Sequence, residues 1–229
     1  MSILRSLVYY PVFYGWSAIL VIGSVIALFL GKAQLRAVVT SWSRWHRWCL
    51  KAIVGIDVVV EGKLADGPAL YAIKHESYFE AIDAPTLLDT PSVFAKRELF
   101  MIPGWGRSAV VYGLIPVARD EGARTLRQMI VNAKEKLNEG RPLVIFPEGT
   151  RVAPGQSPPL QSGFAGLYKL LGLQVIPVAV NSGRLYHRLW KRSGTITYKI
   201  GEPVPASLPR AEAEARVHAA MNALNKAAQ

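Results

Sequence analysis

The sequence is constrained most by an uncharged apolar segment near its amino terminus. No acidic, basic or histidine residue occurs from Ser6 to Gly31, and Leu7 to Leu30 would span about 36 Å as an α-helix, slightly more than the hydrocarbon core of a bilayer. A cleaved signal peptide would have a shorter apolar run, whereas Lys32 and a second helical pattern follow directly here. The segment therefore predicts a retained membrane helix, and whether it spans the bilayer or lies in one leaflet stays open.

A basic segment rich in tryptophan follows. Residues 33–54 show a helical pattern in which indoles alternate with cations, namely Trp42, Trp45 and Trp48 with Arg44, Arg47 and Lys51. Indole rings and long cationic side chains both favour the headgroup level of a bilayer. We therefore expect a helix that lies in the membrane interface and contacts anionic lipids, with an ordinary core helix as the alternative.

The charges around the apolar segment predict its orientation. Only Arg5 precedes the segment, whereas five Lys and Arg residues follow it before the first acidic residue, Asp57. Because positively charged flanks stay in the cytoplasm, we expect the rest of the chain to face the cytoplasm at the inner (plasma) membrane.

The composition agrees with a membrane-bound protein that has one globular domain. The chain has 229 residues, of which 51% are hydrophobic, and a net charge of +11. Nucleic acid and an anionic membrane would both suit this charge, but no nucleic-acid-binding motif occurs, so we expect membrane lipids and no nucleic acid as partners. We divide the chain into a membrane anchor with an interfacial helix, residues 1–55, and a domain over residues 56–229. The single Cys49 excludes an internal disulfide and a Cys-rich metal site.

Beyond residue 55, short β-branched runs alternate with helical patterns. The candidate strands are residues 57–61, 69–74, 92–95, 114–118, 142–146, 174–180 and 195–200. Amphipathic helices are expected over residues 122–138 and after the proline-rich segment 203–209. Strands separated by helices predict an α/β domain with a mostly parallel sheet covered by helices, preceded by the two-helix membrane-binding segment.

The sharpest polar cluster is KHESYFE, residues 74–80, directly after a predicted strand. Ser77 and Glu80 have the spacing of a capping box, which makes Ser77 the expected N-cap of a helix. Helical side chains lean toward the amino terminus, so the Glu80 carboxylate would lie near His75 and orient it as a general base. Alternatively, Glu80 only caps the helix and His75 bonds to backbone. Asp83, one turn further on, is a second candidate partner.

The sequence does not match other catalytic or cofactor-binding signatures. The zinc pattern H-E-x-x-H ends in Phe79 instead of histidine, and no G-x-S-x-G nucleophile elbow occurs. A G-x-G-x-x-A pattern at residues 104–109 follows Pro103 and has no leading strand, so it does not indicate a dinucleotide site. Without an activated Ser or Cys, direct attack by a substrate hydroxyl is favoured over a covalent acyl-enzyme.

A second cluster, FPEGTR at residues 146–151, ends another apolar strand. A turn containing Gly149, Thr150 and Arg151 offers N–H groups, a hydroxyl and a guanidinium, which together can hold a phosphate. The stretch GLIPVAR likewise ends a strand with Arg119. Two arginines at strand ends suggest one anionic ligand, with an exposed loop arginine as the alternative for each.

Together these blocks resemble the glycerolipid acyltransferases, specifically the 1-acylglycerol-3-phosphate acyltransferases. KHESYFE resembles the family's His-x-x-x-x-Asp block, and FPEGTR is its most recognisable hexapeptide. FAKRELFMIPGWG, GLIPVAR and VIPVAVNSG are similar to its Lys-x-Glu-Leu, glycine-to-arginine and Val-Pro-Val blocks, and all five occur in the family's order. The resemblance covers about residues 57 to 200.

The resemblance implies an enzyme that transfers a fatty acyl group to the sn-2 hydroxyl of lysophosphatidic acid, giving phosphatidic acid. The implied donor is a thioester, acyl-CoA or acyl-acyl carrier protein, and no metal or resident cofactor is implied. His75 would be the general base and Glu80 its orienting carboxylate. The residues implied to bind substrate are Lys96, Arg119, Glu148, Gly149, Thr150 and Arg151.

Three positions depart from the family pattern. Glu80 stands where the family has Asp, Ala118 replaces an acidic residue, and Gln161 lies where many relatives have lysine. These changes leave another lysolipid acceptor, such as lyso-ornithine lipid, as an alternative. A catalytically silent lipid-binding protein is a third reading, against which the intact His75 and FPEGTR argue.

Overall fold

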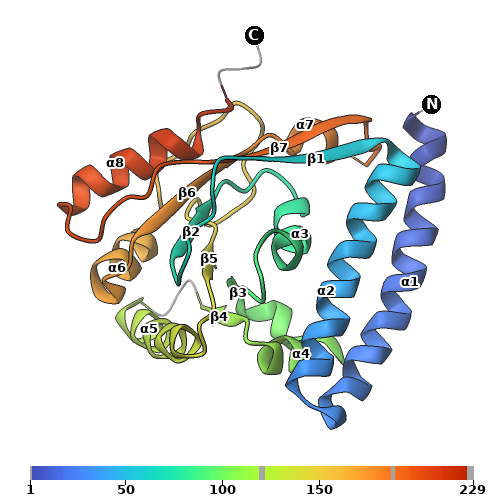
Figure 1. Cartoon of the computed structure of the whole chain (residues 1–229), viewed down its shortest axis with the longest axis horizontal. Helices are drawn as coiled ribbons and strands as arrows, with labels where there is room; N and C mark the ends of the chain where they lie inside the picture. The colour runs from blue at the N-terminus through green and yellow to red at the C-terminus, as the bar shows by residue number, and fades with distance from the viewer. Residues whose placement is uncertain (1, 119–121, 187–188, 226–229) are drawn as a thin grey trace.

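Figure 1 shows the computed structural model of the chain, which describes residues 2–118, 122–186 and 189–225. The helices are α1 (Ser2–Leu30), α2 (Lys32–Cys49), η1 (Leu50–Val54), α3 (Phe79–Leu87), η2 (Arg97–Met101), α4 (Trp105–Tyr112), α5 (Gly122–Asn138), α6 (Ser162–Leu171), α7 (Gly183–Tyr186) and α8 (Arg210–Met221). The strands are β1 (Ile56–Glu61), β2 (Leu70–Ile73), β3 (Ser92–Lys96), β4 (Ile115–Val117), β5 (Leu143–Ile145), β6 (Val175–Val180) and β7 (Gly194–Ile200). Each predicted strand is confirmed to within one residue at either end.

The strands form one sheet in the order β1-β7-β6-β2-β5-β3-β4. Strands β6, β2, β5, β3 and β4 run in one direction, while β1 and β7 run in the other because β6 and β7 pair antiparallel. The central strands β2, β5 and β6 are buried along their whole length, as expected for continuous apolar strands with helices on both faces. The predicted α/β fold with a mostly parallel sheet is confirmed.

Alternate residues of the central strands point into two apolar cores, one on each face of the sheet. On one face, Tyr71 and Ile73 of β2 share a core with side chains of α1, η1 and α3. On the other face, Leu70 and Ala72 share a core with side chains of α5, α6 and α8. In Figure 1 the first group of helices lies on the right of the sheet and the second on the left.

Helix α1 is joined to the rest of the molecule near both of its ends. Tyr9 and Phe13 are fully buried in the same core as the first face of the sheet. Tyr9 Oη lies 3.0 Å from Tyr186 Oη, and toward the other end Ser24 Oγ donates to Ser108 Oγ at 3.1 Å. The predicted domain boundary between residues 55 and 56 stays a prediction, and one apolar core contains side chains from both sides of it.

The opposite side of α1 is apolar and exposed. Its exposed large side chains are Ile3, Leu4, Leu7, Val8, Tyr14, Trp16, Ile19, Ile22, Ile26, Phe29 and Leu30. The backbone of Gly104 lies against Val21 and Val25 of α1, and Met101 and Ile102, shortly before it, are also exposed. The apolar surface of α1 therefore continues onto the segment between η2 and α4. By length and composition α1 could cross a membrane.

Most of the cations of helix α2 form ion pairs with other parts of the protein. Its cations pair with carboxylates as follows: Lys32 and Arg36 with Glu139, and Arg47 with Asp83; in η1, which follows, Lys51 pairs with Asp57. The Arg47–Asp83 pair is two-pronged, at 2.5 and 2.8 Å, and joins α2 to α3. Trp42 donates to Ser17 of α1 at 2.9 Å, whereas Trp48 is exposed. The expected interfacial helix thus also connects α1 with the sheet domain.

Because Phe13 lies in the main core, Phe13→Ala should lower the free energy of unfolding by about 3–5 kcal/mol, the usual range for a buried phenylalanine. Denaturant unfolding in detergent micelles would measure this change. Tyr14→Ala is the matched control, because the neighbouring Tyr14 is 56% exposed. Equal, small losses for both variants would show that α1 contributes nothing to the core.

Candidate active site

The carboxyl ends of four parallel strands meet at one edge of the sheet. β2, β5, β3 and β4 are neighbours in that order, so the segments that follow them lie along one edge. His75 follows β2, Phe146 follows β5, and Lys96 ends β3. Arg119, expected after β4, lies outside the described residues. The edge brings His75 and the FPEGTR turn together.

His75 and Glu80 lie within hydrogen-bonding distance, with His75 Nδ1 3.1 Å from Glu80 Oε2. Helix α3 has Tyr78 as its N-cap, one residue later than expected. The Ser77 hydroxyl nevertheless accepts the N–H of Phe79, at 3.1 Å, as a capping serine does. The other half of the expected capping box forms, since Glu80 accepts the Ser77 N–H at 3.0 Å. With Nδ1 facing Glu80, Nε2 is the ring nitrogen left to face a substrate.

The Glu80 carboxylate is fully buried, so each of its oxygens needs a hydrogen-bond donor. Oε2 accepts the N–H of Ser77 and faces His75. Oε1 accepts the hydroxyl of Ser182, from the loop between β6 and α7, and lies 3.5 Å from the Ser77 hydroxyl. These partners hold the carboxylate in one orientation, with one oxygen toward the imidazole.

The FPEGTR turn and Val152, the residue after it, contact His75 at three points. Glu148 Oε2 accepts the His75 N–H at 3.0 Å, and the His75 carbonyl accepts the Val152 N–H at 2.7 Å. The imidazole stacks on the Phe146 ring, with centroids 4.1 Å apart and an interplanar angle of 23°. The His75 side chain is only 15% exposed. The two motifs therefore form a single site, in which the backbone and the ring of His75 are both fixed.

Glu148 forms a buried ion pair with Lys74. Lys74 Nζ donates to Glu148 Oε1 at 2.9 Å, and also to Gln156 O and Asn222 Oδ1 at 2.8 Å each. Both charged side chains are at most 1% exposed. Lys74 and the His75 N–H thus each contact one oxygen of Glu148, so this carboxylate supports the His75 turn, and its expected contact with substrate stays a prediction.

The next three residues of the turn lie nearer to solvent. Gly149 has a φ of +71°, and a Cβ there would come within 2.8 Å of Gln161 Cγ, so only glycine suits this position. Thr150 and Arg151 are exposed. The Arg151 guanidinium lies 3.8 Å from the centroid of the Tyr78 ring, a cation–π contact. A cation therefore stands beside the His75 turn, as the sequence predicted for a phosphate site.

Two other candidate site residues, Lys96 and Asp83, form ion pairs with residues other than His75. Lys96 is on the same edge, two strands from His75, and its ammonium lies 3.4 Å from Glu98 in an exposed ion pair. Asp83, the alternative partner for His75, is fully buried and holds Arg47 instead. Among the described contacts of His75, the carboxylate beside the imidazole is that of Glu80.

Glu76 is a second buried carboxyl group beside His75. Its Oε2 accepts the N–H of Gly183 at 2.9 Å. Burial raises the pKa of Glu76 to about 7, although the Gly183 N–H opposes the shift. Glu76 thus ties the loop after β6 to the His75 turn.

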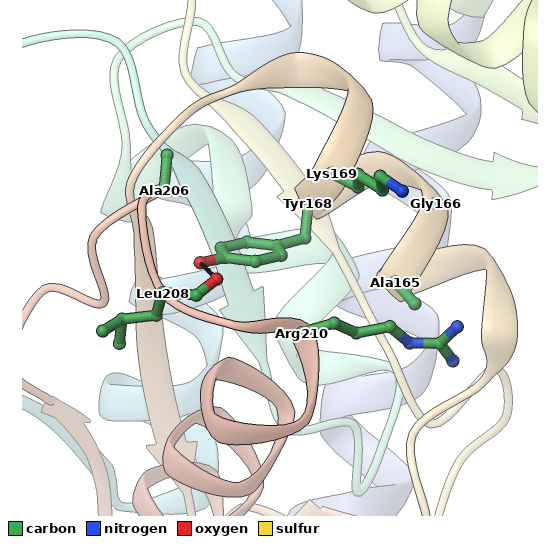
Figure 2. A pocket seen from close by; sticks show the side chains of 7 residues that line it. All are labelled: Ala165, Gly166, Tyr168, Lys169, Ala206, Leu208 and Arg210. Atoms are coloured by element: carbon green, nitrogen blue, oxygen red, sulfur yellow. Dashed lines mark hydrogen bonds between the residues drawn. The ribbon is translucent and has the colours of Figure 1, made fainter.

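A cavity of about 380 Å³ lies between α6 and the segment that leads into α8 (Figure 2). It is lined by Ala165, Gly166, Tyr168, Lys169, Ala206, Leu208 and Arg210. Val204, just before this segment, pairs with Val175 at the start of β6. The cavity therefore lies toward the amino ends of the parallel strands, away from His75, and contains no residue of the predicted site.

Sequence reasoning gave no role to Lys74, Phe146 or Ser182, although all three belong to recognised blocks. Ser182 follows β6, which is parallel to its neighbour β2. The rule that carboxyl ends of parallel strands share an edge would have placed Ser182 near His75. Its contact with Glu80 depends on a side chain 102 residues away, which no local pattern shows.

The chain is similar to known acyltransferases over most of its length. The family model described as Acyltransferase matches residues 55–181. A 1-acyl-sn-glycerol-3-phosphate acyltransferase from Pseudomonas aeruginosa is 32% identical over 189 residues, which is 80% of this chain and 74% of that protein. One from Helicobacter pylori is 29% identical over 142 residues, which is 61% of this chain and 60% of that protein.

The fold also matches a solved structure. The crystal structure of the 1-acyl-sn-glycerophosphate (LPA) acyltransferase PlsC from Thermotoga maritima superposes with a TM-score of 0.76, at 24% identity, over 100% of this chain and 99% of that one. The family match covers more than half of the chain, and it includes both His75 and the FPEGTR turn. The chain therefore belongs to the acyltransferase family. It is an acyltransferase enzyme.

Proposed function

We propose that this acyltransferase acylates the sn-2 hydroxyl of lysophosphatidic acid to give phosphatidic acid, a step of phospholipid biosynthesis. The observation that carries the proposal is the contact between His75 Nδ1 and the buried Glu80 carboxylate, next to a turn that presents Arg151. The relatives from Pseudomonas aeruginosa and Helicobacter pylori bear the name of this activity. The acyl donor is a thioester of coenzyme A or acyl carrier protein.

His75 acts as general base in this proposal. Its Nε2 takes the proton of the acceptor hydroxyl while the hydroxyl oxygen attacks the thioester carbonyl carbon. The tetrahedral intermediate then expels the thiolate, the C–S bond breaks, and the thiolate takes the proton from the imidazolium. Glu80 stabilises the imidazolium and holds Nδ1 as the donor toward its own carboxylate.

The acceptor phosphate is held by the FPEGTR turn. Gly149 allows the left-handed backbone of the turn, and Thr150 and Arg151 are exposed beside His75. A guanidinium can bind two phosphate oxygens at once. We assign Arg151 to this contact, with Arg119 as its partner on sequence grounds.

His75→Ala should lower kcat by about 10²- to 10⁴-fold while the protein stays folded, since positioned general bases contribute this much. Glu80→Gln should also lower kcat, and Glu80→Asp should keep a substantial part of it. Steady-state kinetics with lysophosphatidic acid and a thioester donor would measure these changes, with His218→Ala on α8 as the control. Normal turnover in His75→Ala would end this mechanism. A larger loss in folded Asp83→Asn than in Glu80→Gln would mean that the carboxylate is wrongly assigned.

Arg151→Ala and Arg119→Ala should each raise the KM for lysophosphatidic acid about tenfold or more, because a charge-assisted contact is lost. The KM for the thioester donor should stay nearly constant. Arg151→Lys should rescue poorly, since an ammonium cannot make the two-pronged contact. Arg216→Ala, an exposed arginine of α8, is the control. An unchanged acceptor KM in both variants would contradict the assignment of these arginines to a phosphate site and would favour a zwitterionic acceptor such as lyso-ornithine lipid.

We also propose that α1 lies in the cytoplasmic leaflet of the inner membrane instead of crossing it. A crossing helix would carry one end to the far side of the bilayer, whereas the residues near both ends of α1 contact the same domain, at Tyr186 and at Ser108. The exposed apolar side of α1 and the adjacent Met101 and Ile102 supply the inserted surface.

Ile22→Glu combined with Ile26→Glu should weaken binding to lipid vesicles at least about tenfold, because charged side chains are expelled from hydrocarbon. Co-sedimentation with vesicles would measure the binding. Both isoleucines are more than half exposed, so the fold should persist. Val131→Glu on α5 is the matched control, since Val131 is equally exposed on a different helix. Unchanged binding of the double variant would show that this side of α1 does not insert.

A further inference from the structure

The loop after β6 contributes a buried hydroxyl to the catalytic carboxylate. Ser182 is fully buried, and its Oγ lies 2.8 Å from Ser77 Oγ and donates to Glu80 Oε1. A serine has a single hydroxyl hydrogen. With that hydrogen directed at Glu80, the Ser77 hydroxyl is the donor to Ser182, so the two serines form a short chain that ends on the carboxylate.

The terminal torsion of a glutamate has no sharp preferred angle, so hydrogen-bond partners decide how its carboxylate is turned. In Glu80 the two oxygens have separate partners. Oε2 faces His75 and accepts the Ser77 N–H, and Oε1 accepts from Ser182. Without the Ser182 hydroxyl, Oε1 loses its shortest contact and keeps only the Ser77 hydroxyl at 3.5 Å, so the plane of the carboxylate is held less firmly toward Nδ1.

The position of Ser182 is itself fixed from two directions. Its carbonyl accepts the N–H groups of Leu185 and Tyr186, which are the last two residues of α7, at 3.0 and 2.8 Å. The next residue, Gly183, donates to Glu76 Oε2 at 2.9 Å, and a Cβ at Gly183 would come within 3.0 Å of the Glu76 Cβ. The loop is thus anchored to the residue that follows His75 in the chain.

We propose that Ser182 is a positioning residue for acyl transfer, whose hydroxyl holds Glu80 so that one carboxylate oxygen faces His75. The inference rests on the proposed roles of His75 and Glu80. Ser182 is fully buried, so it cannot contact the acceptor or the donor, and it acts on the reaction only through the carboxylate.

The first test compares two buried serines. Ser182→Ala should lower kcat about tenfold to a hundredfold, the effect of losing a hydrogen bond to a charged group, with both KM values unchanged. Ser92→Ala is the matched control, because Ser92 is also fully buried and its hydroxyl has no hydrogen-bond partner among the described residues. Ser92→Ala should leave kcat unchanged. If Ser182→Ala fails to fold, Ser182→Cys keeps the shape with a weak donor and should show the same loss.

A double-mutant cycle separates positioning from a general structural effect. In the Glu80→Gln background the charge that Ser182 orients is gone, so Ser182→Ala should change kcat much less than it does in the wild type. An equal fold-loss in both backgrounds, or a normal kcat in folded Ser182→Ala or Ser182→Cys, would overturn the proposal.

The kinetics of these variants distinguish the proposed mechanism from the proposed role of Ser182. If His75→Ala and Glu80→Gln retain normal turnover, the proposed mechanism fails and the role of Ser182 falls with it. If both of those variants lose turnover while Ser182→Ala keeps it, the mechanism stands and only the positioning role is lost.

Discussion

The buried carboxylate of Glu148 is the interaction on which the site depends most. Glu148 lies in the turn that follows β5, and its carboxylate binds both the ammonium of Lys74 and the N–H of His75, 73 residues earlier in the chain. Removing either charge would leave the other buried without an opposite charge, which is strongly destabilising. Since the imidazole also stacks on Phe146, the proposed general base is held in place by the fold itself.

Helix α3 connects this site to the two amino-terminal helices. Glu80 lies in its first turn beside His75, and Asp83 follows three residues later in a buried pair with Arg47 of α2. On the far side of the same core, Tyr186 of α7 contacts Tyr9 of α1, and α7 follows Ser182 directly. The two amino-terminal helices and the Glu80 carboxylate are therefore parts of one packed unit.

Local patterns were enough for much of the fold and for part of the site. Strand positions followed from short β-branched runs, and the proximity of His75 and Glu80 followed from a capping-box spacing that is only half realised. The inward direction of Glu148 and the hydroxyl of Ser182 could not be foreseen, because their partners lie 73 to 102 residues away. Helices α4 and α6 were also not predicted. Gly104 and Gly113 lie directly before and after α4 and make it short, and no clear break in the sequence pattern precedes α6.

The sequence by itself determined the apolar segment, the strands, the alternation that predicts an α/β sheet, and the blocks that resemble a family. Only the tertiary structure decided which side of α1 meets the protein, because the segment has no charged residue from Ser6 to Gly31 to mark a face, and the partners of Ser6, Ser17 and Ser24 lie elsewhere in the sequence. The tertiary structure also decided the partners of the cations of α2. Their sequence pattern suggests contact with anionic lipid, whereas most of them pair with carboxylates from distant parts of the chain. The charge pattern shows which groups need a partner, and the tertiary structure determines which residues become those partners.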